Sequence, residues 1–402
     1  MLDLLKLAGI LALIIALLRL HWNLGLVLLL ASALTGLLFG RPPVGVGGDI
    51  LTAALDPLTL RLIAIVLLIT FLGEILRRTE LLAGLVRSLE DLFVDRRWLL
   101  ALMPMLIGML PMAGGALFSA PMVQEASQDL EVSPERRTFL NYWFRHSLES
   151  VFPLYPSLVL AAGLMEVPVQ TLTRTQFPLF VAMLVSGILF GLLGIPRAVD
   201  QGDRRPARRE TLVLLSKSIW PIALVLGLAL LVGMDLILSL LLTLAALVAV
   251  HRLGPRQVWE AARGTSLSAV PILVGAMAFR HVLETSSAVL VVSQAFGQLG
   301  IPLAVVLFAV PLIAGLLTGL AVPAFAIAFP IVLPLCGGDP ITSGCGLWIY
   351  CGGLVGLLLS PVHLCLALTR DYFGASWGGV YRRLLPAALL VALTAALVAL
   401  VR

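Results

Sequence analysis

The sequence predicts an all-α integral membrane protein that crosses the bilayer many times. Of its 402 residues, 60% are hydrophobic and only 12% are charged, and the mean hydropathy is +1.06. A soluble domain carries about twice that charged fraction. Several windows approach the roughly 20 apolar residues that a helix needs to cross a bilayer. They are Leu4–Leu20, Leu24–Phe39, Leu58–Leu76, Phe177–Ile195, Thr211–Val232, Leu236–Val250 and Leu385–Val401.

The composition also argues against several classes of partner. The formal charge is +5, but the basic residues gather in loops, so the charge favours a positively charged membrane face over nucleic-acid binding. The first segment lacks a small-residue cleavage site, so we expect a retained helix. The four cysteines form no CxxC pair, and we expect small apolar residues packed among helices, with no metal site and no cofactor. They are Cys336, Cys345, Cys351 and Cys365.

Two halves of the chain resemble each other. Pro104-x3-Gly108 recurs as Pro311-x3-Gly315, and Trp143-x12-Pro156 recurs as Trp348-x12-Pro361. Several such matches in the same order indicate a duplication. We therefore expect an N-terminal transmembrane repeat over residues 1–200, a basic cytoplasmic linker over 201–210 and an inverted C-terminal repeat over 211–402.

Each half contains two interrupted apolar segments. Gly and Pro break the first, at the centres of Trp98–Glu125 and Pro302–Leu335, and this predicts a re-entrant hairpin in each half. Prolines break the second, a long helix expected over Arg137–Glu166 and Cys345–Arg370. A simple proline kink would explain one break. Matched broken segments in two halves are instead typical of a transporter binding site.

The distribution of basic residues predicts the orientation. With the loop after Leu76 in the cytoplasm and an odd number of crossings per half, most Arg residues fall on the cytoplasmic side. This scheme places the protein in the cell membrane (inner or plasma membrane), with both termini on the external side.

Ionisable residues inside the apolar segments cluster just before the first helix break. Arg145, His146 and Glu149 lie there, at spacings that let Glu149 contact either of the others on one helix face. Such residues are functional candidates by default, although an ion pair that fixes helix packing is the structural alternative. We expect Glu149, helped by His146, to couple transport to protons.

The second half offers less chemistry. Near its helix break stand Ser360 and His363, and a histidine there is more often a packed or loop-bonding residue than a ligand. Gly114 and Gly115 at the first hairpin tip would let the backbone approach a ligand. Arg145 and the helix starts after the tips favour an anion, such as a small organic carboxylate. The candidate substrate- or ion-binding residues are Gly114, Gly115, Ser119, Asn141, Arg145, His146, Glu149, Ser150, Thr318, Gly319, Ser360 and His363.

These features carry a family resemblance. Two inverted halves, each with a hairpin and a proline-broken helix, resemble the ion transporter superfamily, which includes sodium–dicarboxylate symporters and gluconate permeases. The stretch Pro111–Pro121, followed by Asn141-Tyr-Trp-Phe-Arg-His146, is most similar to an uncharacterised prokaryotic integral-membrane family within that group. The resemblance implies a midplane site, elevator-like motion and a homodimer. The Ser-Asn-Thr tip signatures of the dicarboxylate symporters are absent, which argues against sodium and dicarboxylates.

The sequence therefore predicts a secondary active transporter of a small organic or inorganic anion, coupled to protons or sodium. A channel or lipid translocator is the first alternative, and it would not need an ionisable cluster beside a matched break. An intramembrane enzyme is the second. No His-Glu-x-x-His or Gly-x-Ser-x-Gly motif is present, so no catalytic residue and no enzymatic activity are expected.

Overall fold

A computed structural model describes residues 2–93, 95–109, 115–128, 130–196, 208–286, 288 and 301–401. Within these ranges the regular elements are all helices, as the sequence predicts. Four of the described helices are long and apolar enough to cross a membrane, and the number rises to six if each of two bent helix pairs counts as one span. These helices suit a multi-pass membrane protein.

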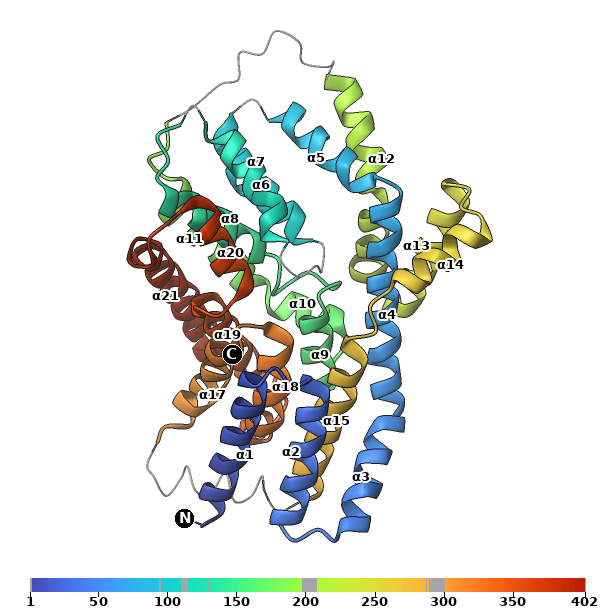
Figure 1. Ribbon diagram of the computed structural model, residues 1–402, viewed down its shortest axis with the longest axis vertical. Coiled ribbons are helices and arrows are strands. Elements are labelled where there is room, and N and C mark those ends of the chain that lie inside the picture. Colours follow the sequence, from blue (N-terminus) through green and yellow to red (C-terminus); the bar gives the residue numbers. More distant parts are fainter. Residues whose placement is uncertain are drawn as a thin grey trace.

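The N-terminus and the first three helices lie at the lower end of the elongated molecule, and the next two helices continue the chain to its upper end (Figure 1). Asn23 caps one of them, because its side chain accepts a hydrogen bond from the Gly25 amide at 2.9 Å. Asp56 caps the 22-residue helix Pro57–Arg78, because its side chain accepts a hydrogen bond from the Leu58 amide at 2.7 Å. The helices are α1 (Leu2–Arg19), α2 (Leu24–Leu38), α3 (Pro43–Leu55), α4 (Pro57–Arg78) and α5 (Leu81–Leu92).

The next six helices contain the first predicted interrupted helix. It ends at His146 and resumes at Pro156, whose ring suits the first turn of a helix. Ser133 caps its start through the Arg136 amide. The helices are α6 (Arg96–Gly108), α7 (Ala116–Ala126), α8 (Pro134–His146), α9 (Pro156–Leu164), α10 (Val169–Thr175) and α11 (Phe177–Gly187), which continues into a π-helical turn (Ile188–Leu192).

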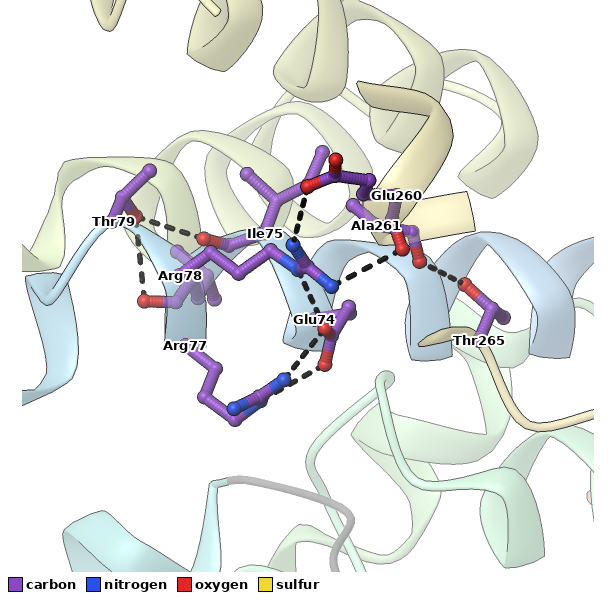
Figure 2. A network of polar contacts seen from close by, with 9 residues as sticks. Glu74, Ile75, Arg77, Arg78, Thr79, Glu260, Ala261 and Thr265 are labelled. Carbon is purple, nitrogen blue, oxygen red and sulfur yellow. Dashed lines mark hydrogen bonds and ion pairs between the residues drawn. The ribbon is translucent and has the colours of Figure 1, made fainter. Parts of the chain in front are cut away.

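Four helices follow residues 197–207. They are α12 (Arg208–Leu226) with its π-helical turn (Gly227–Leu231), α13 (Leu236–Val250), α14 (Pro255–Gly264) and α15 (Ala269–Thr285). A polar network joins α14 to the end of α4 (Figure 2). Glu74 accepts hydrogen bonds from Arg77 and Arg78, and Arg78 also donates to the Glu260 carbonyl at 3.1 Å. The network holds α14, which projects from the side of the molecule in Figure 1, against α4.

The last described helices contain the second predicted interruption. They are α17 (Leu303–Thr318), α18 (Ala321–Val332) with a short 3₁₀ turn (Leu333–Cys336), α19 (Cys345–Leu359), α20 (Leu364–Phe373) and α21 (Trp377–Val401). The turn between α17 and α18 contains Gly319, whose φ of +63° suits a residue without a Cβ. The break between α19 and α20 spans Ser360 to His363, as the sequence predicts.

One expectation about the cysteines is wrong. Cys336 and Cys345 form a disulfide, with their Cα atoms 6.1 Å apart, so these two are not free apolar residues. The sequence lacked a CxxC signal because the bridge closes a nine-residue separation across a turn. Within that turn, hydrogen bonds from the Ile341 amide and then the Thr342 hydroxyl hold the pKa of Asp339 below its ordinary value. Cys351 and Cys365 are free and buried, as expected.

Helices α8 and α19 form the centre of the packing. From Thr138 to His146 every residue of α8 is buried, and α19 is buried along almost its whole length. A helix buried on every face lies in the interior of a bundle rather than on its surface. Figure 1 places α8 beside α20 near the middle of the molecule, and the two pack against each other. The ionisable cluster of α8 is therefore enclosed by protein.

Candidate functional site

The last turn of α8 and the break after it carry three buried ionisable side chains. Arg145, His146 and Glu149 are 5%, 7% and 6% exposed. His146 Nδ1 lies 2.9 Å from Glu149 Oε2, which realises the contact that their spacing predicts. Ionisable groups are costly to bury without a partner, so this pairing explains how the carboxylate is tolerated.

A second histidine reaches the same point from the other end of the sequence. His363 precedes α20, is 4% exposed and places its Nε2 atom 3.1 Å from His146 Nε2. The aromatic ring of Tyr142 packs against both imidazoles, with ring centroids 4.9 Å and 5.4 Å apart. The site therefore joins two segments that lie 217 positions apart.

The turn between α17 and α18 positions His363. The imidazole Nδ1 lies 2.5 Å from the Gly319 carbonyl oxygen, and Ser360 donates a hydrogen bond to the Leu316 carbonyl at 2.7 Å. A Cβ on Gly319 would come within 2.9 Å of the His363 amide nitrogen, so only glycine fits this close approach. The turn is thus docked directly on the break between α19 and α20.

A similar contact joins the α6–α7 region to the break after α8. A Cβ on Gly108 would lie 2.2 Å from the Arg145 carbonyl oxygen, and Tyr155 donates a hydrogen bond to the Gly108 carbonyl. The guanidinium of Arg145 lies against Gly115, where a Cβ would meet Nη2 at 2.4 Å. These glycines allow α6 and the start of α7 to pack tightly against Arg145.

Asn141 and two tyrosines hold the two interrupted helices together. Asn141 donates to the Ala116 carbonyl at 3.0 Å and to the Thr369 hydroxyl at 3.1 Å, linking α7, α8 and α20. Tyr350 of α19 donates to the Glu149 carbonyl at 2.9 Å. Tyr142 of α8 donates to the Leu358 carbonyl at 3.2 Å at the end of α19. These bonds tie α8 to α7, α19 and α20, and the bond from Tyr350 ties the break at Glu149 to α19.

The remaining predicted residues take different places. Ser119 is buried on α7 and donates to the Ala116 carbonyl, while Thr318 donates to the Ala314 carbonyl, so both hydroxyls serve their own helices. The hydroxyl of Ser150 is buried and has no hydrogen-bond partner among the described residues. Gly114 lies outside the described residues.

Sequence reasoning missed Cys365. Its Sγ atom and the nearest ring nitrogens of His146 and His363 all lie within 4.8 Å of one another, and all three residues are buried. Such a group can hold a metal ion, although the cysteine spacing predicted none. The available signal was the His363-x-Cys365 pair beside a helix break, but His146 joins it only through the tertiary structure.

A cavity among the described residues lies apart from this cluster. It has a volume of about 440 Å³ and is lined by residues from the end of α9, the end of α15 and the end of α18, including Glu166, Arg280 and Glu284. Arg280 donates to Glu284 at 2.8 Å and also to Glu166. None of the lining residues belongs to the His146–Glu149–His363 cluster, so the cluster does not open into this cavity.

Comparison with known proteins identifies a family without assigning an activity. Residues 3–402 match the model of a family described as protein of unknown function (DUF401). No curated protein matches the chain significantly. The match covers nearly the whole chain, and the protein therefore belongs to the DUF401 family.

Proposed function

We propose that this DUF401 protein is a secondary active transporter that carries a small anion across the cell membrane by alternating access. The observation that supports this most is the enclosed cluster of Arg145, His146, Glu149 and His363 at the meeting point of two helix breaks. Ionisable residues inside membrane segments are rare and costly, and they are functional-site candidates by default. A substrate that replaced one of these contacts would change the balance between two arrangements of the breaks.

The order of the helices supports two related repeats. The proposed alignment pairs the helices in chain order: α4 with α15, α6 with α17, α7 with α18, α8 with α19 and α9 with α20. Two equivalent glycines make the same kind of contact. A Cβ on Gly108 would strike the Arg145 carbonyl of α8, and one on Gly315 would lie 2.6 Å from the Gly353 carbonyl of α19. Equivalent close packing is what a duplicated hairpin and helix would retain.

The disulfide supports the proposed orientation. Disulfides persist in oxidising compartments and are rare in the cytosol. The inverted-repeat scheme places the segment between Cys336 and Cys345 on the external side of the membrane, opposite to residues 201–210. This argument is independent of the arginine distribution, and both lead to external termini.

The proposed substrate is an anion because Arg145 supplies a permanent positive charge near the glycine at the start of α7. Small organic carboxylates are the first class to test, with inorganic anions as the second. Coupling to protons or sodium and assembly as a homodimer are part of the same proposal.

Counterflow in proteoliposomes tests the proposal. Purified protein is reconstituted, the vesicles are loaded with a high concentration of one unlabelled carboxylate, and uptake of a trace of the labelled compound is followed. A carrier exchanges the two and accumulates label transiently. A channel only lets the label equilibrate. The test variant is Arg145→Gln, which removes the positive charge and should abolish the transient accumulation of label. Absence of counterflow across a panel of organic and inorganic anions would refute the carrier proposal.

A further inference from the structure

We propose that His146, His363 and Cys365 bind one Zn²⁺ ion per chain, at the contact between α8 and the start of α20. This site goes beyond the proposed transport function and does not depend on it. Imidazole nitrogens and a thiolate are the donors that zinc prefers, and three protein ligands are the number that zinc sites with an open position use. The three donors are within 4.8 Å of one another and are buried.

The hydrogen bonds at the outer ring nitrogens orient both histidines for this role. A carbonyl oxygen can only accept, so His363 Nδ1 donates to Gly319. An ionised Glu149 likewise accepts from His146 Nδ1. Each neutral imidazole then carries its lone pair on Nε2, and these two nitrogens face each other. Two lone pairs at that separation require a cation or a donor between them.

The distances suit a metal ion. Two nitrogens bound at about 2.0–2.1 Å to a tetrahedral ion lie about 3.3 Å apart. The two Nε2 atoms are separated by 3.1 Å, so a small displacement of either ring would complete the geometry. The Sγ atom of Cys365 lies within 4.8 Å of the nearest ring nitrogens of both histidines and is placed to supply the third ligand.

The surroundings also resemble those of metal sites. Metal-binding histidines commonly donate their second N–H to a carboxylate or a backbone carbonyl, and here Glu149 and Gly319 provide one of each. Tyr142 covers both rings, and its hydroxyl is turned away toward the Leu357 and Leu358 carbonyls. The fourth position would take water or a small anion. A proton shared by the two imidazoles is the competing explanation.

Metal binding by the purified full-length protein separates the two. After treatment with a chelator, the protein is titrated with Zn²⁺ and, in parallel, with Co²⁺, whose bond to a thiolate gives a near-ultraviolet charge-transfer band. We expect one Zn²⁺ per chain and a Co²⁺–thiolate band. Cys365→Ser should lose the band. Removing a group that only hydrogen-bonds to a metal-binding histidine weakens metal affinity by about 10–100-fold. His363→Ala removes a ligand itself and should weaken Zn²⁺ binding at least as strongly.

Cys351→Ser is the matched control. Cys351 is also free and buried, but it lies on α19 and its thiol contacts the Val391 carbonyl. The control should retain both the stoichiometry and the band. Failure of the wild-type protein to bind Zn²⁺, a preference for copper alone, or an equal loss in Cys351→Ser and Cys365→Ser would each overturn the proposal. These results do not depend on transport, so a protein that binds Zn²⁺ without counterflow refutes only the transporter proposal.

Discussion

Replacing Gly319 by alanine tests whether the turn between α17 and α18 positions the site. Gly319 has a φ of +63°, a conformation that costs a residue with a Cβ about 1–2 kcal/mol. The added Cβ would also lie 2.9 Å from the His363 amide nitrogen and 3.0 Å from the Val362 carbonyl carbon. Both atoms belong to the backbone and cannot rotate away. Forcing them apart costs about 1–3 kcal/mol, and disturbing the hydrogen bond to His363 costs a further 0.5–1.5 kcal/mol, each an approximate value.

Gly374→Ala provides the matched control for this substitution. Gly374 follows α20 with a φ of +65°, but nothing lies within 4 Å of a Cβ built there. It therefore bears the conformational cost without the contact. We expect Gly319→Ala to be destabilised by about 2–4 kcal/mol more than Gly374→Ala. Thermal melting and denaturant titration of the detergent-solubilised variants measure the difference in their free energies of unfolding. Equal destabilisation of the two variants would refute the docking of Gly319 on His363.

Three further predictions concern the site and its orientation. Tyr350→Phe removes the donor to the Glu149 carbonyl and should lower the free energy of unfolding by about 1–3 kcal/mol in the same assay; an unchanged midpoint would show that the bond contributes nothing. Glu149→Gln should preserve counterflow but abolish accumulation driven by a pH gradient, and accumulation that persists would exclude Glu149 as the coupling residue. After reduction, Cys336 and Cys345 should react with an impermeant thiol reagent added to intact cells, whereas a cysteine placed at Arg204 should not; the reverse pattern would invert the topology.

The candidate site was only partly predictable because its members come from distant segments. The three-residue spacing was enough to predict that His146 and Glu149 make contact, although α8 ends at His146 and Glu149 lies in the turn that follows the helix. No local pattern could bring His363 and Cys365 to them. That meeting depends on how α20 packs against α8 and on the Gly319 carbonyl that holds the His363 ring.

The sequence by itself determined the helices and their interruptions. A chain rich in apolar residues must satisfy its backbone polar groups inside helices when it lies in lipid, and proline and glycine end those helices for local steric reasons. Hence the helices are interrupted beside the prolines that predict the breaks, although the first break already begins after His146, so that Glu149 lies within it rather than before it. Only the tertiary structure decided which breaks face each other, because side-chain contacts across the bundle depend on packing rather than on chain order. The same reason explains the convergence of His146, His363 and Cys365.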